Sequence, residues 1–169
     1  MSGKSFELYF IRHAIAEERG DKWPDDGLRP LSAEGASLMR KAAKGLVRLG
    51  VKFDVVLSSP LVRARQTAEI VAEAFDSKPP IVTADALGTE GTYANLLSEL
   101  QKHSRRRSIA LVGHEPNIGE LAARLAGCRR PLEFKKGAVC RIGIASIPPA
   151  GPGVLRWFIT PAVLRAIRK

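Results

Sequence analysis

Short apolar runs alternate along this chain with longer segments of helical periodicity. Segments 8–11, 54–58 and 108–112 are apolar along nearly their whole length, which is typical of strands buried on both faces. The residues after Ser32, a good N-cap, carry leucine and alanine on one helical face until Gly50. Strands that alternate with helices in this way predict an α/β fold, in which a largely parallel central sheet lies between two layers of helices.

The last part of the chain has a different pattern. Segments 138–147 and 154–159 alternate between apolar and polar residues, and proline, glycine and alanine fill the turn between them. Such a pattern predicts two antiparallel strands at one edge of the sheet. The full prediction is a three-layer α/β/α arrangement with an antiparallel edge near the C-terminus. No linker or repeat divides the chain, so we expect one domain over residues 1–169.

Histidines follow two of the predicted buried strands. His13 follows the first strand, directly after Arg12, and His114 follows the strand at 108–112. A single histidine beside a strand is usually a loop or core residue, but the chain has three histidines and two of them hold equivalent positions. The carboxyl ends of parallel strands open into the crevice where open α/β sheets bind ligands. If the two strands are neighbours, we expect both imidazoles at one site.

Arginine side chains near this expected site favour the binding of a phosphate. A helix is predicted after segment 54–58, with Ser59 as its N-cap and Pro60 at its first position. Arg63 lies in the first turn of this helix, whereas Arg65 is about 200° further round and would point elsewhere. Guanidinium groups match the oxygens of a phosphate, and a helix N-terminus adds N–H donors. Arg63 and Arg12, together with the two histidines, therefore predict a pocket for a tetrahedral dianion.

The loop at 14–29 is expected to lie over the carboxyl end of the first strand, where loops usually carry function. Arg29 ends this loop. Its side chain either folds back onto the phosphate or pairs with Asp25 or Asp26 at the surface, and the sequence leaves both arrangements open. A third guanidinium would join the pocket only in the first case.

An excess of positive charge runs through the chain. Lys and Arg number 27 against 17 for Asp and Glu, a formal net charge of +10 that attracts phosphates, nucleic acids or acidic proteins. A basic nucleic-acid-binding module is the alternative from another functional class. The chain has no aromatic-rich recognition strand, no zinc knuckle and no continuous basic helix apart from a short one at the C-terminus. We therefore expect no nucleic-acid partner.

The sequence shows no signature of a metal site, a P-loop nucleotide site or a membrane span. The arginines beside the two histidines would repel a cation and no further ligand completes a set, so we expect no metal and no other cofactor. There is no P-loop motif. The first strand begins without an apolar leader, and no segment has the length and hydrophobicity of a membrane span. A cytoplasmic protein without membrane association is the resulting expectation.

Three motifs resemble, in their order and spacing, the signatures of the histidine phosphatase superfamily. They are Phe-Ile-Arg-His-Ala at 10–14, Ser-Ser-Pro-Leu-Val-Arg-Ala-Arg-Gln-Thr at 58–67 and Val-Gly-His at 112–114. The small size, the Arg-Pro-Leu-Ser-x-x-Gly segment at 29–35 and the ending around 157–161 are most similar to the short SixA-type branch, the phosphohistidine phosphatases. The resemblance implies a phosphoglycerate mutase-like fold.

The resemblance also implies roles for the residues of the site. His13, if neutral, would attack phosphorus and form a covalent phosphohistidine that water later cleaves. Arg12 and Arg63 would hold the phosphoryl oxygens, and a protonated His114 would add a third cationic donor, so that no metal is needed. The commonest first motif of the family is Arg-His-Gly, whereas Ala14 stands at its third position here. Alanine is small enough to keep the backbone close to the phosphate.

The proton donor for the leaving group is the least defined residue. Larger relatives place a glutamate between the second helix and the third strand, where Glu90 is the nearby candidate, and the loop acids Glu17, Glu18 and Asp21 compete with it. A phosphohistidine demands less of such an acid, because its imidazole can leave as a neutral group. The resemblance favours phosphohistidine on a protein, such as a phosphotransfer or phosphocarrier domain, as the substrate. A small phosphorylated metabolite is the alternative.

Overall fold

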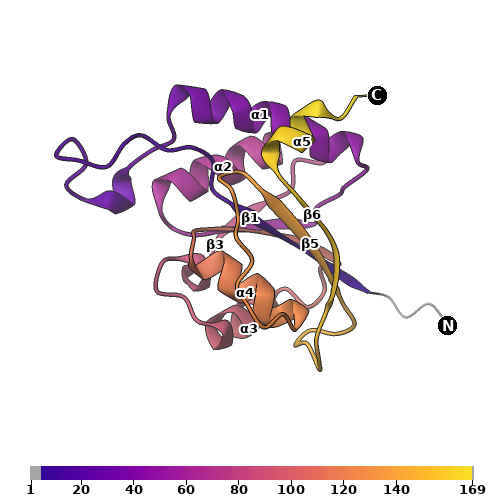
Figure 1. Cartoon of the computed structure of the whole chain (residues 1–169). Coiled ribbons are helices and arrows are strands. Elements are labelled where there is room, and N and C mark those ends of the chain that lie inside the picture. Colours follow the sequence, from indigo (N-terminus) through magenta and orange to yellow (C-terminus); the bar gives the residue numbers. More distant parts are fainter. Residues whose placement is uncertain (1–4, 169) are drawn as a thin grey trace.

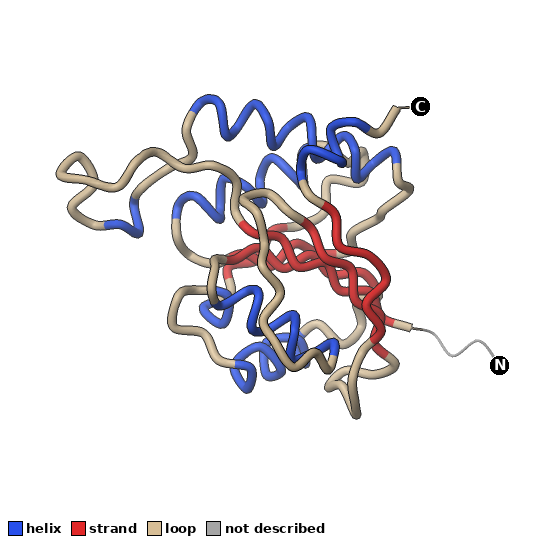
Figure 2. The backbone as a smooth tube through the Cα atoms, viewed as in Figure 1, coloured by secondary structure: helices blue, strands red, loops and turns tan. Residues whose placement is uncertain are grey.

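A six-stranded sheet runs through the centre of the computed structural model, which describes residues 5–168 (Figure 1 and Figure 2). Its strands are β1 (Phe6–Arg12), β2 (Val55–Ser58), β3 (Ile81–Thr83), β4 (Ser108–Gly113), β5 (Val139–Ile144) and β6 (Val154–Ile159). Their order across the sheet is β3-β2-β4-β1-β5-β6. Strands β1 to β4 are parallel, whereas β5 is antiparallel to both of its neighbours. The prediction of a mostly parallel sheet with an antiparallel edge near the C-terminus is confirmed.

Helices cover both faces of this sheet. On one face lie α1 (Ala33–Arg48), α2 (Val62–Glu73) and α5 (Pro161–Ala166), and on the other lie α3 (Tyr93–Lys102) and α4 (Asn117–Ala126) (Figure 1). Two short 3₁₀ helices, η1 (Asp26–Leu28) and η2 (Asp85–Leu87), belong to loops. Alternate residues of β1 divide between the two cores, since Tyr9 and Ile11 pack on the α1 side and Leu8 and Phe10 on the α4 side. No helix within residues 5–168 is long and apolar enough to cross a membrane.

The N-terminus of α1 fixes the segment that leaves β1. The Ser32 hydroxyl accepts the N–H of Gly35 at 2.9 Å, as expected of an N-cap, and the Ser32 N–H donates to the carbonyl of Ile15 at 3.1 Å. A Cβ atom at position 35 would lie 2.0 Å from that carbonyl oxygen. Glycine therefore lets the chain after β1 pack directly against α1, and this contact anchors one end of the loop at 14–29.

The start of α2 differs from the prediction. The sequence favoured Ser59 as the N-cap and Pro60 as the first helical residue, but the helix begins at Val62, after Leu61, with no side-chain cap. The Ser59 hydroxyl instead accepts the N–H of Leu61 at 3.2 Å, within the turn that joins β2 to the helix. The prediction was wrong because a serine followed by proline also suits a turn, and the sequence does not show where helical dihedral angles begin.

Candidate active site

The sheet order brings together the ends of three strands. Strand β4 lies between β1 and β2, and all three run in the same direction, so their carboxyl ends share one edge. His13 follows β1 and donates its backbone N–H to Gly113 of β4 at 2.9 Å. His114 follows β4, and the ring centroids of the two histidines are 5.1 Å apart. The expected convergence of the two imidazoles is therefore observed.

The hydrogen bonding of His13 assigns its tautomer. Its Nδ1 atom lies 2.7 Å from the carbonyl oxygen of Ala14, which can only accept, so Nδ1 carries the proton and the lone pair is on Nε2. The residue is 6% exposed, and this burial lowers the pKa of His13 to about 3 against an ordinary value of 6.5. The nearby His114 and Arg63 act in the same direction. At neutral pH the ring is uncharged, which is the form that a nucleophilic imidazole needs.

His114 contacts Ser59, the residue that follows β2. Its Nε2 atom lies 2.7 Å from the hydroxyl oxygen of Ser59, while its Nδ1 is buried and has no hydrogen-bond partner within residues 5–168. Burial, and then the charge of Arg63, lower the pKa of His114 to about 4. His114 is therefore also neutral in the anion-free protein, and only a negative charge close to the ring would favour its protonated form.

Arg12 approaches the site from the end of β1. Its Nη1 donates to the carbonyl of Phe134 at 2.7 Å, and the N–H of Phe134 in turn donates to the Glu115 carboxylate at 2.9 Å. These two hydrogen bonds connect the loop before β5 to the ends of β1 and β4. The Nε atom of Arg12 is buried without a hydrogen-bond partner in the described part of the chain.

One carboxylate joins the two other arginines of the site. Arg63 donates from Nη1 to the backbone oxygen of Asp26 at 2.7 Å and from Nη2 to its Oδ2 at 3.1 Å. Arg29 donates from Nε to Oδ1 of the same residue at 2.8 Å. Of the two arrangements left open for Arg29, the structure therefore has the pairing with Asp26. Arg29 is buried at 7% exposure, whereas the Asp26 side chain is 45% exposed, so the pair reaches the surface through Asp26, which also binds Arg63.

Arg65 points away from the site, as the helical period predicts. Its Nε lies 3.1 Å from the Glu69 carboxylate, one turn further along the exposed side of α2. Arg63 is 2% exposed on the same helix, and its Nε, like that of Arg12, is buried without a hydrogen-bond partner in residues 5–168. Within that range, four buried side-chain nitrogen or oxygen atoms lack a hydrogen bond, and three of them belong to Arg12, Arg63 and His114. The two arginine Nε atoms can only donate, and buried donors without partners are costly, so this cluster points to a missing acceptor.

Sequence reasoning did not identify two buried hydroxyl groups of the site. Ser59 was interpreted as a helix cap, yet its hydroxyl lies against His114. Thr67 accepts the backbone N–H of Ala14 at 3.0 Å and donates to the carbonyl of Arg63 at 2.7 Å, which links the residue after the nucleophile candidate to α2. Both lie inside the motif at 58–67. A threonine one helical turn after Arg63, facing the core, was the available signal.

The carboxylates considered as proton donors lie in different places. Glu90 is exposed and lines a cavity with His103, and this lining includes none of Arg12, His13 and His114. Glu17 contributes its backbone carbonyl to Arg29 at 2.8 Å, and Glu18 and Asp21 are exposed. No group of three metal-ligating side chains occurs within residues 5–168.

Asp26 is the carboxylate that the structure brings to Arg29 and Arg63. The hydrogen bond from Arg29, with the charge of Arg63, lowers the pKa of Asp26 despite some desolvation. An ionised carboxylate in this position holds arginines in place but is a weak source of protons.

Stability should depend on pH because both buried histidines are neutral. Their pKa values of about 3 and about 4 in the folded protein lie below the ordinary value of 6.5, so the unfolded chain binds more protons below pH 6.5. The free energy of unfolding is therefore highest above pH 6.5 and decreases as the pH falls toward 4. We expect the two histidines to lower the free energy of unfolding by on the order of 3 kcal/mol between pH 7 and pH 5.

Chemical denaturation at both pH values measures this effect. A His13→Asn/His114→Asn variant, which cannot titrate at these positions, should lose much less stability on acidification. An equal loss in the wild type and the variant would contradict the assignment.

Comparison with known proteins gives the chain a family. The model of the histidine phosphatase superfamily (branch 1) matches residues 8–88. An uncharacterized protein of a Picosynechococcus species is 41% identical over 122 residues, which cover 71% of this chain and 73% of that protein. The phosphohistidine phosphatase SixA of Escherichia coli is 26% identical over 165 residues, which cover 94% of this chain and 96% of SixA.

The fold supports the same relationship. A solved structure of the protein histidine phosphatase SixA complexed with tungstate has a TM-score of 0.83 and 25% sequence identity to this chain, and the match covers 94% of this chain and 99% of that one. The three motifs of the superfamily surround the site described above, at 10–14, 58–67 and 112–114. The chain belongs to the histidine phosphatase superfamily, branch 1, and is a phosphatase of that superfamily.

Proposed function

We propose that this phosphatase acts through a covalent phosphohistidine on His13 and removes phosphate from phosphohistidine on another protein. The observation that carries the catalytic part is the set of unpartnered buried nitrogens on Arg12, Arg63 and His114, next to a neutral His13. A phosphoryl group supplies the acceptor oxygens that the two arginine nitrogens lack and that a protonated His114 can bind. The positive charge that a phosphoryl transfer needs comes from the guanidinium groups.

The first chemical step uses the lone pair of His13. Nε2 attacks phosphorus in line, so that the new N–P bond forms as the bond to the leaving group breaks. The ring then carries a positive charge, which the Ala14 carbonyl stabilises through its bond to the Nδ1 proton. In the second step a water oxygen attacks phosphorus, the N–P bond breaks and the lone pair returns to Nε2. Inorganic phosphate leaves, and His13 is again neutral.

His114 changes its protonation state during this cycle. In the anion-free protein its pKa is about 4, but a bound phosphoryl dianion favours the protonated ring. The protonated Nδ1 then donates to a phosphoryl oxygen and adds to the positive charge from Arg12 and Arg63. The Ser59 hydroxyl, 2.7 Å from Nε2, orients the ring for this contact.

The choice of phosphohistidine rests on the leaving group. The carboxylate bound to Arg29 and Arg63, Asp26, has a lowered pKa and is ionised at neutral pH, so it does not readily protonate an alkoxide. The imidazole of a phosphohistidine needs less help, because with a proton on its far nitrogen it departs neutral. The similarity to SixA of Escherichia coli, a phosphohistidine phosphatase, over 94% of this chain supports the same substrate class.

A comparison of substrates tests this proposal. The purified protein is given a ³²P-phosphorylated histidine phosphocarrier protein, a phosphorylated histidine-phosphotransfer domain and a panel of phosphorylated metabolites. We expect kcat/KM for at least one phosphohistidine protein to exceed that for every metabolite by about 10³-fold, a difference of about 4 kcal/mol in transition-state stabilisation. Because phosphohistidine hydrolyses slowly by itself, the rate with a His13→Ala variant is subtracted. Faster cleavage of a metabolite would show that the protein is a phosphomonoesterase instead.

A further inference from the structure

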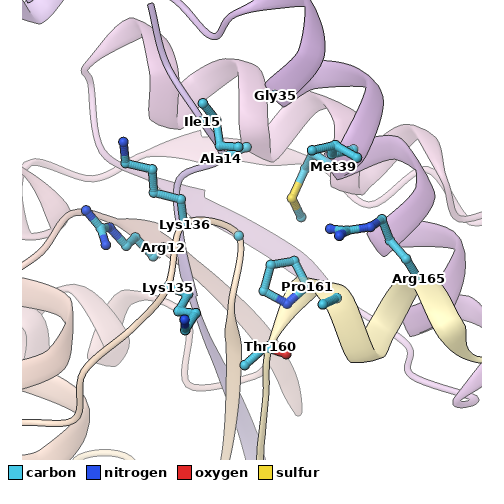
Figure 3. Close-up of a pocket in the computed structure, with 13 residues that line it drawn as sticks. Arg12, Ala14, Ile15, Gly35, Met39, Lys135, Lys136, Thr160, Pro161 and Arg165 are labelled. Atoms are coloured by element: carbon cyan, nitrogen blue, oxygen red, sulfur yellow. The ribbon is translucent and has the colours of Figure 1, made fainter. Parts of the chain in front are cut away.

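A groove of about 710 Å³ lies beside Arg12, between α1, the loop before β5 and the start of α5 (Figure 3). Its apolar lining includes Ile15, Leu38, Met39 and Pro161. Met39 is only 2% exposed, whereas Ile15, Leu38 and Pro161 are partly exposed and form the accessible apolar surface of the groove. Apolar side chains that line an open groove are a surface on which another molecule buries apolar groups.

The groove opens at the same edge of the sheet as His13. Strand β5 is antiparallel to β1 and begins at the edge where β1 ends, with Val139 opposite Ile11. Strand β6 ends at that edge too, because Ile159 is opposite Val139, and α5 starts immediately afterwards. The groove and the phosphate site are therefore neighbours, and Arg12 belongs to both.

Positive charge surrounds the apolar lining. Four cationic side chains line the groove, those of Arg12, Lys135, Lys136 and Arg165, and no acidic residue does. Lys135, Lys136 and Arg165 make no side-chain hydrogen bond or ion pair within residues 5–168. Cations that are concentrated around an apolar surface without internal partners favour a negatively charged occupant.

The two lysines are held close to the nucleophile. Gly137, the next residue, donates its N–H to the backbone oxygens of Arg12 at 3.0 Å and His13 at 3.2 Å. Its φ of +84° is favourable for glycine, so the turn that carries the lysines is fixed by the sequence. A ligand bound to Lys135 and Lys136 is thereby placed beside the residue that receives the phosphoryl group.

We propose that this groove binds an acidic, amphipathic segment of the phosphoprotein substrate and so presents its phosphohistidine to His13. Apolar side chains of that segment pack on Ile15, Leu38 and Pro161, and its Asp or Glu side chains pair with Lys135, Lys136 and Arg165. The proposal rests on the function proposed above and adds a specificity-determining surface to it. A nucleic acid fits less well, because no Phe, Tyr or Trp side chain lines the groove on which a base could stack.

Two matched phosphohistidine peptides test the groove. One carries glutamate and leucine around the phosphohistidine, and the other carries lysine and leucine at the same positions; p-nitrophenyl phosphate serves as a substrate without flanking groups. For the wild type we expect kcat/KM to be about 10-fold higher with the acidic peptide, through a lower KM, and the preference to shrink at high salt. All three substrates use the same phosphate site.

A charge-reversed variant assigns the preference to the groove. Lys135→Glu/Arg165→Glu should abolish the preference for the acidic peptide while p-nitrophenyl phosphate turnover stays within about twofold. The control variant, Lys41→Glu/Lys44→Glu, makes the same change in net charge at two exposed positions of α1 that do not line the groove, and should keep the preference. Equal kcat/KM for the two peptides, or a preference that survives in the groove variant, would overturn the proposal.

A measurement of peptide binding tests the groove independently of the proposed phosphohistidine substrate. If p-nitrophenyl phosphate is cleaved but neither peptide is, the phosphohistidine substrate is wrong, whereas the groove is still tested by fluorescence anisotropy with the unphosphorylated peptides. Tighter binding of the acidic peptide to the wild type and to the Lys41→Glu/Lys44→Glu control than to the groove variant supports the docking surface. Equal binding to all three proteins contradicts it.

Discussion

Replacement of His13 by alanine should reduce kcat/KM for p-nitrophenyl phosphate by at least about 10⁴-fold, because the variant has no nucleophile to form the covalent intermediate. The assay contains no added metal. His13 is the histidine whose Nδ1 proton is held by a backbone carbonyl and whose Nε2 keeps its lone pair. A phosphoenzyme that is stable to base and labile to acid, the chemistry of phosphohistidine, should form with the wild type and be absent from the variant.

His103→Ala is the matched control for this experiment. His103 lies at the end of α3, where its Nε2 is 3.2 Å from the Glu99 carboxylate, and it lines a cavity that contains no residue of the active site. Its removal should leave kcat/KM within about twofold of the wild type. Thermal unfolding of both variants would check that they are folded. Equal turnover by His13→Ala and the wild type would rule out His13 as the nucleophile.

The second large effect is expected at Arg63. An Arg63→Ala variant should lose about 10³-fold in kcat/KM, since a guanidinium that holds the phosphoryl oxygens stabilises charge in the transition state. Inhibition by tungstate should weaken as well, because the same donors bind a tetrahedral oxyanion. Arg63 is 2% exposed, and its Nη atoms are held by Asp26, so its position is well defined.

Arg65→Ala provides the comparison on the same helix. It removes an equal charge two residues away, but its side chain faces Glu69 on the outside of α2. We expect kcat/KM and tungstate inhibition to change by less than about twofold, the effect of a surface ion pair. Similar losses in the two variants would mean that Arg63 acts only through the net charge of the protein. A large loss confined to Arg63 would place this residue at the phosphoryl group.

The order of structural elements was predictable because their signals are local. Ser32 and Gly50 bound the predicted first helix, and the structure has α1 at Ala33–Arg48. The strand prediction at 154–159 matches β6 at Val154–Ile159. The cap at Ser59 was wrong, since one hydroxyl satisfies either a helix end or a turn, and in the fold it also meets His114 from another strand.

The site was predictable in its residue types and less so in its contacts. His13, His114, Arg12 and Arg63 each stand at or soon after the end of a buried strand, which the sequence shows directly. Asp26 was only one of two candidate partners for Arg29. Its bridge to Arg63 depends on the path of a loop that little periodicity describes, so no local pattern could reveal it.

The sequence by itself determined the apolar strands, the polar groups at their ends and the motifs of the superfamily, because each depends on residues close together in the chain. Only the tertiary structure decided that β4 lies between β1 and β2, which sets the two imidazole centroids 5.1 Å apart. It also decided that burial keeps both rings neutral and that Lys135, Lys136 and Arg165 surround one groove. These properties follow from desolvation and from contacts between distant segments, which exist only once the sheet is assembled.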